Sequence, residues 1–340
     1  MISLLVVNYR SAALAAEAIR SARETAGESI QVVVVDNSVD AREAEALRPH
    51  ADVLIASATN RSYGGGNNDG RRACEGDVIL LTNPDVTFAP GAIEALRDAL
   101  DTRTAVAGPA LFWDEVHTWH LPPADLHSGR EKLDEVLASR ARSWSAQRDL
   151  RRFRQRAHFW SLTQTTRVRA LSGAVMAIRA SDFDDAGGFD ERFPLYFEET
   201  DLLRRLAERH RQIVYVPVAR VRHIYNQSAG QEAAAAAARY AESELRYLEK
   251  WNGPWAARTL KRLERPRSTG GLPRAQSVAS NDVITEASPL ENFDTAAGAF
   301  GTHENVSDDI WAAYRGETLH LRTVDRATGR VLAMSTRYRT

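Results

Sequence analysis

The stretch ISLLVVNYRSAALAAEAIRSARETAGESIQVVVVDNS, residues 2–38, determines the fold class of this chain. It begins with the nearly continuous apolar run 2–7 and contains a second such run, 32–35, with a helix-like segment, 12–25, between them. Unbroken apolar runs are typical of strands that are buried on both faces, and a helical crossover joins two parallel strands. The stretch therefore predicts the first βαβ unit of a doubly wound α/β sheet.

Two further apolar segments extend this alternation. Residues 53–55 predict a short third strand, and residues 78–81 predict a clearer one that is followed by a helix over residues 90–100. Ligands of doubly wound sheets bind outside the carboxyl ends of the strands. The candidate binding residues are therefore the polar residues that directly follow these runs, among them Asn8, Tyr9, Asp36, Asn83 and Asp85.

The C-terminal part of the chain predicts a small appendage. A strand over 213–221, which we expect Pro217 to interrupt, and an alanine-rich helix over 232–251 precede it. The sequence RPRSTGGLP, residues 265–273, has the composition of a linker. Beyond this linker, the segments 317–324 and 330–339 flank DRATG and predict a hairpin with its turn near Gly329. We therefore expect a small β-containing extension over residues 274–340.

Composition limits the class of protein. The chain has 340 residues, of which 44% are hydrophobic and 26% charged, and its formal net charge of −1 gives no general attraction to nucleic acid. Cys74 is the only cysteine, so an internal disulfide is excluded and a buried apolar role is expected for it. No apolar run approaches the roughly 20 residues that span a bilayer, and the first ten residues are too strand-like for a signal peptide. We expect a cytoplasmic protein, with peripheral contact to the inner face of the membrane left open.

Residues 140–169 are rich in arginine. They contain nine arginines and one acid, Asp149, with aromatic residues interleaved. A solvated helix face is the favoured interpretation, and a patch that binds an anionic ligand or a membrane surface is the alternative.

The sequence GGFDERFPLYFEETD, residues 187–201, places the carboxylates of Glu198, Glu199 and Asp201 directly after an aromatic run. Crowded carboxylates raise one another's pKa and resist burial, so this cluster is typical of a catalytic base, a cation site or a helix end. The helical spacing of the following TDLLRRLAERHRQ favours a helix end for one of the three.

The sequence NRSYGGGNNDG, residues 60–70, surrounds three consecutive glycines with polar side chains. Glycines permit close approach of the backbone to a ligand, and asparagine side chains both donate and accept hydrogen bonds. A flexible loop is the ordinary interpretation and a phosphate-cradling loop is the alternative. Neither GxxxxGK[ST] nor GxGxxG is present.

Three further residues have both a structural and a functional interpretation. Asp36 can accept a hydrogen bond from a ribose hydroxyl or a base N–H, although DNS alone is typical of a turn. Asp85 can hold Mg²⁺ or Mn²⁺ beside a diphosphate, although NPD alone is more often a turn. For His223, at the end of VPVARVRH, a role in binding metal or phosphate is about as well supported as a structural role.

Six segments of the chain together resemble glycosyltransferase family 2, and within it the rhamnosyltransferase-like inverting enzymes with a GT-A fold. They occur in the order of the family over residues 1–228 and read VVNYRS, VVVDNS, NRSYGGGNNDG, LLTNPDV, LSGAVMAIRASDFDDAGGFDERFPLYFEETDLLRRL and VPVARVRHIYNQS. The resemblance implies a glycosyltransferase domain over 1–264. This domain would consist of a nucleotide-sugar-binding half at 1–112, the arginine-rich insert at 113–169, and a half over 170–264 that contains the catalytic and acceptor residues and a C-terminal helix.

The resemblance also assigns residues to the donor. It implies base and ribose contacts for the residues after the first strands, and an enclosing role for the segment rich in glycine and asparagine. The residues concerned are Asn8, Tyr9 and Asp36 for the nucleoside, and Asn60, Gly65 and Asn67, followed by Arg61 and Asn68, for the enclosing segment. Ser62 stands where the family often has glycine.

Asp85 matches the last aspartate of the family's DXD-like motif, which implies that it binds Mg²⁺ or Mn²⁺, with His223 as a further candidate ligand. Asn83 stands where many relatives have aspartate, and we count it among the donor-binding residues.

The acidic pair of the family falls on Glu198 and Glu199. Its second member is the usual base, so Glu199 is the implied catalytic base and Glu198 is next. Asp201 matches the residue that opens the following helix.

The implied reaction is inverting transfer of a sugar from a nucleotide diphosphate sugar to an acceptor hydroxyl. The resemblance favours dTDP-rhamnose as donor, with UDP-sugars next, and the acceptor is a lipid-linked glycan, a cell-wall polysaccharide or a small molecule. Two rival hypotheses are a catalytically silent nucleotide-sugar-binding or scaffold protein and a sugar-nucleotide pyrophosphorylase. The second rival normally has a glycine-rich, basic loop after its first strand, and VVNYRSAAL contains no glycine.

Overall fold

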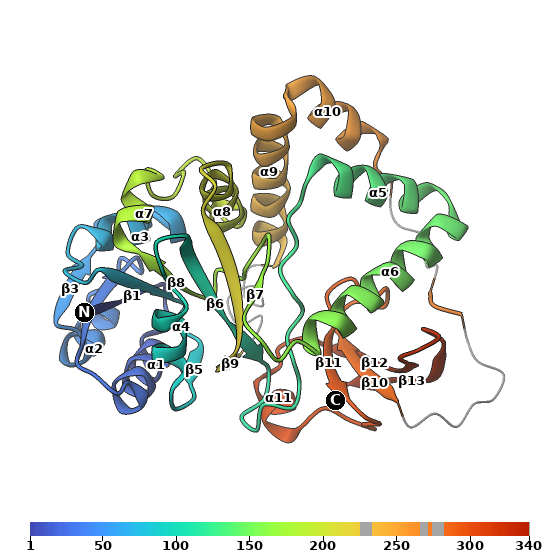
Figure 1. The fold of residues 1–340 in the computed structure, drawn as a ribbon, viewed down its shortest axis with the longest axis horizontal. Coiled ribbons are helices and arrows are strands. Elements are labelled where there is room, and N and C mark those ends of the chain that lie inside the picture. Colours follow the sequence, from blue (N-terminus) through green and yellow to red (C-terminus); the bar gives the residue numbers. More distant parts are fainter. Residues whose placement is uncertain (225–232, 266–270, 274–281, 340) are drawn as a thin grey trace. The chain divides into compact units, whose positions relative to one another are not determined.

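The computed structural model describes residues 1–224, 233–265, 271–273 and 282–339, which form two structural units (Figure 1). The first unit consists of Met1–Leu111, Thr163–His223 and Ala233–Arg246. The second contains Phe112–Leu162 and the described residues that follow Arg246. The arginine-rich insert is therefore grouped with the C-terminal part of the chain.

The first unit is built on a mixed sheet with the strand order β3-β2-β1-β4-β8-β6-β9-β5, and β7 also pairs with β9. The four N-terminal strands β3, β2, β1 and β4 run parallel, and β8 pairs with β4 in the antiparallel direction. The strands are β1 Ile2–Asn8, β2 Ile30–Asp36, β3 Val53–Ala56, β4 Val78–Thr82, β5 Val86–Phe88, β6 Thr104–Phe112, β7 Thr166–Arg167, β8 Val175–Arg179 and β9 Gln212–His223. The expected α/β sheet is confirmed.

Helices cover both faces of this sheet. Alternate residues of β1 point to opposite faces, so Leu4 and Val6 belong to the core that includes α1, whereas Leu5 and Val7 lie under the glycines of α3. The helices of this unit are α1 Ala12–Thr25, α2 Ala41–Leu47, α3 Ser62–Arg71, α4 Ala92–Asp98, α7 Ala180–Asp185, α8 Glu198–Glu208 and the first part of α9 Ala233–Asn252, and a 3₁₀ turn, Arg48–His50, follows α2. The predicted helix at 12–25 has the expected bounds.

Two expectations about local structure are wrong. The flexible loop predicted over 60–70 is mostly the helix α3, because its glycines let it pack directly against β1 and β2. A Cβ added to Gly66 would lie 2.8 Å from Val7 Cγ1. Pro217 does not interrupt β9, since it falls between the residues that pair with β7 and those that pair with β5, where its missing N–H leaves those pairings intact.

The second unit combines four helices and the last part of α9 with an antiparallel sheet of order β11-β10-β12-β13. Phe153, Ala157 and Trp160 of α6 pack on Ile284 and its neighbours from that sheet. The predicted C-terminal hairpin is confirmed as β12 and β13, and Gly329 in its turn has φ +72°. The elements are α5 Gly129–Arg140, α6 Arg142–Trp160, α10 Pro254–Leu263, α11 Asp308–Ala313, β10 Val283–Ser288, β11 Ala297–Phe300, β12 Thr318–Asp325 and β13 Val331–Tyr338.

Three arginines of α6, Arg148, Arg152 and Arg156, belong to a largely buried ionic network, so the predicted solvated face is wrong for these three, whereas the other arginines of the helix are exposed. Arg156 and Arg322 pair with the two carboxylate oxygens of Glu286, each at 2.6 Å, and the three side chains are 4%, 4% and 0% exposed. Arg148 pairs with Asp294 at 2.9 Å. The carboxylates that make burial of these arginines favourable come from other segments of the second unit.

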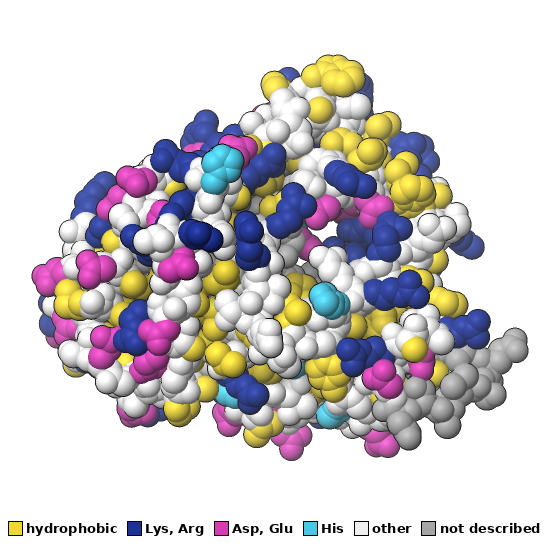
Figure 2. Space-filling model, in the orientation of Figure 1, with side chains coloured by type: hydrophobic (Ala, Val, Ile, Leu, Met, Phe, Trp, Pro, Cys, Tyr) yellow, Lys and Arg dark blue, Asp and Glu magenta, His cyan; other side chains and the backbone are white. Residues whose placement is uncertain are grey.

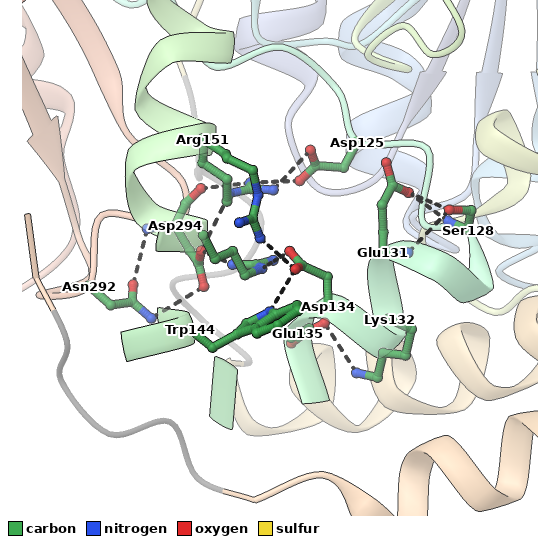
Figure 3. A network of polar contacts seen from close by, with 12 residues as sticks. Asp125, Ser128, Glu131, Lys132, Asp134, Glu135, Trp144, Arg151, Asn292 and Asp294 are labelled. Atoms are coloured by element: carbon green, nitrogen blue, oxygen red, sulfur yellow. Dashed lines mark hydrogen bonds and ion pairs between the residues drawn. The ribbon is translucent and has the colours of Figure 1, made fainter. Parts of the chain in front are cut away.

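Figure 3 shows the neighbouring part of this network, in which Asp134 accepts hydrogen bonds from Trp144 Nε1 at 2.8 Å and from Arg151 at 2.5 Å. These bonds hold α5 against α6.

Of the expected linker at 265–273, residues 266–270 lie outside the described residues. Cys74 is buried, as expected, and burial raises the pKa of its thiol to about 11.

Candidate active site

A buried polar network lies where β1 and β2 end. Asp36 Oδ1 accepts hydrogen bonds from Asn8 Nδ2 at 2.9 Å, from the Ser38 amide at 3.1 Å and from Ser38 Oγ at 2.6 Å. Asn8 Nδ2 also donates to Glu43 Oε2 at 3.0 Å, and that oxygen accepts from the Ala12 amide at the start of α1. Asn8 thus ties both strand ends to two helices. Among the described residues, the side-chain bonds of Asp36 all engage Oδ1, which leaves Oδ2 to accept from a ligand.

Tyr9 lies on the surface beside this network. It is 41% exposed, and the guanidinium of Arg10 lies 5.2 Å from the centroid of its ring. An exposed aromatic ring at the end of a parallel strand offers a face on which a nucleobase can stack.

The segment that leads into α3 is held by its own polar side chains. Asn60 Oδ1 accepts from the Ser62 amide at 2.9 Å, and Arg61 pairs with Glu191 at 2.9 Å and with Asp69 at 3.2 Å. Ser62 has φ +60°, in the left-handed region that favours glycine. Asn60 and Arg61 therefore hold the entry to the helix, on a surface that stays partly exposed.

Within α3 the three predicted donor residues have different roles. Gly65 is buried below Arg61. Asn67 Nδ2 donates to the Tyr63 carbonyl at 2.9 Å, while its buried Oδ1 has no partner within the described residues. Asn68 donates to the Phe189 carbonyl and accepts from the Phe189 amide, each at 2.9 Å, so it anchors α3 to the turn before α8.

The two predicted metal ligands lie together. His223 Nε2 is 3.2 Å from Asp85 Oδ1, and β5 brings them together because Val86 pairs with His223 in the sheet. The pair offers one carboxylate and one imidazole at a strand end, a donor set that suits Mn²⁺ better than Mg²⁺. In the described part of the chain no group of three or more His, Cys, Asp or Glu residues could hold a metal ion. A cation here would need oxygens from a ligand or water.

The acidic pair follows a strained junction. Tyr196 and Phe197 have φ values of +66° and +70°, and consecutive left-handed residues without glycine are costly and concentrate at functional sites. Packing sustains this conformation, because the ring centroids of both residues lie within 5.7 Å of that of Tyr240 on α9. The junction fixes Glu198 and Glu199 as the first two residues of α8.

The environments of the two glutamates differ. Glu198 is buried, and its Oε2 has no hydrogen-bond partner within the described residues, whereas Glu199 is half-buried. Burial, followed by the charge of Glu199, raises the pKa of Glu198 well above its usual range. Burial also raises the pKa of Glu199, although backbone N–H groups at the helix start oppose this shift. Of the two carboxyl groups, Glu198 therefore holds its proton more strongly than Glu199.

The segment before β8 connects the acidic pair to the strand end that carries Asp85. A Cβ added to Gly173 would lie 3.3 Å from Glu199 Cγ, so the backbone at this glycine lies directly against the glutamate. The Gly173 carbonyl accepts from Tyr63 Oη at 2.8 Å, and the carbonyl of the next residue, Ala174, accepts from the Asn83 amide at 2.8 Å. Glu199 and the NPD segment are thus joined to the same short stretch of backbone.

Asp201 is a structural residue, in agreement with the helix-opening role expected for it. It is fully buried in the first turn of α8 and pairs with Arg205 at 2.8 Å. Arg205 in turn donates to the carbonyls of Ala186 and Gly188 and fixes the turn before the aromatic run.

Sequence reasoning missed residues that act through others. These residues are Glu43, Tyr63, Gly173 and Tyr240, whose partners are distant in sequence. Two of them carried a signal, since Tyr63 lies inside the glycine-rich segment and Gly173 inside the segment that begins LSGAV. The Tyr63 hydroxyl donates to the carbonyl of Gly173, the residue against which Glu199 lies, and burial, followed by the charges of Glu199 and Glu198, raises the pKa of the Tyr63 phenol.

Comparison with protein families gives one match over most of the chain. The model described as "Glycosyltransferase like family 2" matches residues 1–242. An N-acetylglucosaminyl-diphospho-decaprenol L-rhamnosyltransferase of Mycobacterium tuberculosis, in strains CDC 1551 and H37Rv, is 28% identical over 250 residues. That alignment covers 67% of this chain and 78% of the relative.

Solved structures of glycosyltransferases resemble parts of the fold at low identity. GalNAc-T7 with UDP, GalNAc and Mn²⁺ gives a TM-score of 0.48 at 15% identity, and the match covers 66% of this chain and 44% of that protein. The mannosyltransferase PcManGT from Pyrobaculum calidifontis, in complex with GDP-Man and Mn²⁺, gives 0.47 at 14% identity, over 77% and 73% of the two chains. TarS 1–349 of S. aureus gives 0.43 at 15% identity, over 73% and 72%.

Proposed function

The chain belongs to glycosyltransferase family 2 and is rhamnosyltransferase-like, and from this premise we propose that it is an inverting, metal-dependent sugar transferase. The single observation that carries the proposal is the position of Glu199. Its side chain lies against Gly173, and the adjoining residue Ala174 accepts a hydrogen bond from the strand end that carries Asp85. The residues that we propose as base and as metal ligand beside the diphosphate are thus tied to one stretch of backbone, and this supports the proposal.

In this mechanism Glu199 takes the proton of the acceptor hydroxyl. The acceptor oxygen forms a bond to the anomeric carbon while the bond from that carbon to the diphosphate oxygen breaks on the opposite face. The nucleoside diphosphate leaves with the bonding electron pair, and the product has inverted configuration. Glu198, whose pKa is raised by burial and by the charge of Glu199, resists placing a second negative charge beside the base, and Oδ2 of Asp36 accepts from the nucleoside.

Asp85 and His223 are the residues that would hold Mn²⁺ or Mg²⁺. When bound, the cation neutralises charge on the departing diphosphate. The fit of this chain to a cation rests on a buried carboxylate and an imidazole 3.2 Å apart at the mouth of the sheet.

The proposed donor is dTDP-rhamnose, with a UDP-sugar as the second choice. This preference is supported by the name of the Mycobacterium tuberculosis relative, which is an L-rhamnosyltransferase acting on N-acetylglucosaminyl-diphospho-decaprenol. The same name supports a lipid-linked sugar diphosphate as acceptor and a role in cell-wall or polysaccharide synthesis. We place this activity in the cytoplasm, at the inner face of the membrane. Within the described residues no helix has the length and apolar character needed to cross a bilayer.

The proposal is tested with the purified full chain, dTDP-rhamnose or UDP-sugars, a synthetic N-acetylglucosaminyl-diphospho-prenol and Mn²⁺. Release of nucleoside diphosphate and the mass of the glycosylated product are measured. Glu199→Gln should lower kcat about 10²- to 10⁴-fold, the usual contribution of a general base, because the amide cannot take the proton. Asp85→Ala should lower turnover and remove its dependence on Mn²⁺.

Glu208→Gln is the matched control, because Glu208 is exposed at the other end of the same helix, and it should turn over like the wild type. Donor binding is followed in parallel by thermal shift. Wild-type turnover by Glu199→Gln refutes the assignment of the base. Donor binding without release of nucleoside diphosphate by the wild type would instead identify a silent nucleotide-sugar-binding protein.

A further inference from the structure

The helix α10 presents an exposed face that combines arginine with apolar side chains. Residues 255, 258, 259, 262 and 263 follow helical spacing and share one side, opposite the buried Ala257. Trp255 on this face is 81% exposed, the highest value among the exposed large hydrophobic residues, and Leu263 is 40% exposed. Arg258 and Arg262 lie beside them and are exposed.

A similar stripe runs along α5 in the same unit. Its exposed residues Arg130, Leu133, Leu137 and Arg140 recur at intervals of three and four, so they lie on one side of the helix. Leu133 is 46% exposed and Leu137 36%. On an ordinary surface helix the exposed side carries polar residues, whereas here two leucines face solvent between two arginines.

The two stripes meet. Arg140 Nε donates to the Leu263 carbonyl at 2.9 Å, so the end of the α5 stripe lies against the end of the α10 face. We call the combined set the Trp-Arg surface, and it consists of Arg130, Leu133, Leu137, Arg140, Trp255, Arg258, Arg262 and Leu263. Figure 2 shows hydrophobic and basic side chains together over α10 and α5.

The charge of this surface is one-sided. The α10 segment Pro254–Leu263 contains two arginines and Lys261 but no acid. The acids nearby are engaged elsewhere. Glu249 pairs with Arg258 at 3.0 Å, Asp134 with Arg151 at 2.5 Å, and Lys132 with Glu264 at 2.9 Å and Glu135 at 3.4 Å, while Glu131 takes part in the capping box with Ser128. Apolar side chains between cations, with few free acids, match a surface that is negatively charged outside and apolar below.

From this pattern we propose that the Trp-Arg surface is a docking site for the surface of an anionic phospholipid bilayer. Trp255 and the three leucines would enter the boundary between headgroups and acyl chains, where tryptophan is favoured, and the arginines would contact lipid phosphates. A protein partner would need carboxylates at fixed positions opposite these arginines. A bilayer needs no such match, because its phosphates accept from the arginines and its acyl chains receive the apolar side chains. The inference deepens the proposed function, on whose membrane location it rests, by naming the surface that contacts the bilayer, and it can be tested separately because this binding needs neither donor nor acceptor.

The test is co-sedimentation of the full chain with vesicles of phosphatidylcholine alone or with about one third phosphatidylglycerol. The wild type should bind the anionic vesicles, and the binding should weaken as salt rises because surface charges are screened. The double variant Arg258→Glu/Arg262→Glu should lose about tenfold or more in affinity, since each basic residue near an anionic membrane contributes a factor of about five. Trp255→Ser should weaken binding at both low and high salt.

Matched variants separate the surface from net charge and general exposure. Arg42→Glu/Arg48→Glu changes the net charge equally at exposed positions of the first unit, and Tyr338→Ser removes an aromatic residue that is 67% exposed. Both should bind like the wild type. Arg258→Lys/Arg262→Lys keeps the charges and should retain most of the affinity. Melting temperatures of all variants show that they are folded.

Three results would overturn the proposal. The first is equal binding of the wild type to neutral and anionic vesicles. The second is an unchanged affinity in both Trp255→Ser and the charge-reversed variant. The third is a concentration-dependent dimer, detected by sedimentation, that Trp255→Ser abolishes while no vesicle binding occurs, which would assign this surface to a second copy of the chain. A sugar-transfer assay with a water-soluble acceptor separates failure of this proposal from failure of the proposed function, because these variants should transfer sugar at the wild-type rate.

Discussion

At the level of single residues, the acidic pair carries most of the proposed chemistry. Burial of Glu198 next to Glu199 is unfavourable for the ionised pair, and the strained junction before it adds to this cost. Such groups are retained at sites where function requires them and where the rest of the fold tolerates the loss of stability. The pair therefore makes a prediction about stability as well as one about turnover.

Glu198→Gln should raise the melting temperature at pH 7.5. The pKa of Glu198 is raised in the folded chain, so the unfolded chain releases this proton at a lower pH. The contribution of Glu198 to the free energy of unfolding is therefore fully present below the ordinary glutamate pKa of about 4.3. It is lost as the pH rises through the pKa that Glu198 has in the folded chain. Melting curves at pH 4 and pH 7.5 should show a gain for the variant only at the higher pH.

Glu208→Gln is again the control, because an exposed glutamate gives no such difference. A Glu198→Gln variant that is less stable than the wild type at both pH values would contradict the buried, raised-pKa state of this residue.

Ser62→Gly should stabilise the chain slightly. Ser62 has φ +60°, and a left-handed residue with a Cβ costs about 1–2 kcal/mol. Glycine removes this cost, but it also stabilises the unfolded chain by about 0.4–1 kcal/mol through its larger conformational entropy. Urea unfolding should therefore show a free energy of unfolding that is higher by up to about 1 kcal/mol. Ser62→Ala keeps the Cβ and should give no gain. Equal effects of the two variants would show that the backbone conformation is not the cause.

At the level of elements, the sequence predicted the strands better than the helices. The apolar runs of β1, β2 and β4 are sufficient to predict these strands, because strands buried on both faces need apolar side chains throughout. The helix α3 gave no such signal, since three consecutive glycines are poor helix formers. Its stability comes from close contact with the sheet, and this contact depends on residues far away in the chain.

Gly66→Ala should therefore destabilise the protein although alanine is the better helix former. The added Cβ would lie 2.8 Å from Val7 Cγ1 and 2.9 Å from Asn37 Nδ2, and overpacking of this kind costs about 1–3 kcal/mol. Gly65→Ala is the matched variant in the same helix. Its nearest atom is Arg61 Cβ at 3.3 Å, so the gain in helix propensity of about 1 kcal/mol should offset most of the strain. Urea unfolding that ranks Gly66→Ala at or above Gly65→Ala would refute the packing argument.

At the level of the whole molecule, the order of segments in the chain does not match the units of the structure. The insert Phe112–Leu162 and the C-terminal sheet share one core and one ionic network, although a glycosyltransferase-like segment separates them. Sequence patterns could not predict this, because Arg156 and its partner Glu286 are 130 residues apart. A run of arginines with no nearby acid resembles a solvated face until such partners are known.

Glu286→Gln should loosen the second unit as a whole. The carboxylate is fully buried between Arg156 and Arg322, and removal of one member of a buried ion group costs about 3–5 kcal/mol because the remaining charges are left without compensation. Hydrogen exchange should therefore become faster in α6 and in β10 and β12 together, and stay unchanged in β1 and β2. Glu291→Gln, at an exposed position of the same unit, should change neither. Faster exchange in the C-terminal strands alone would mean that the insert folds without them, and that the shared core is not what stabilises α6.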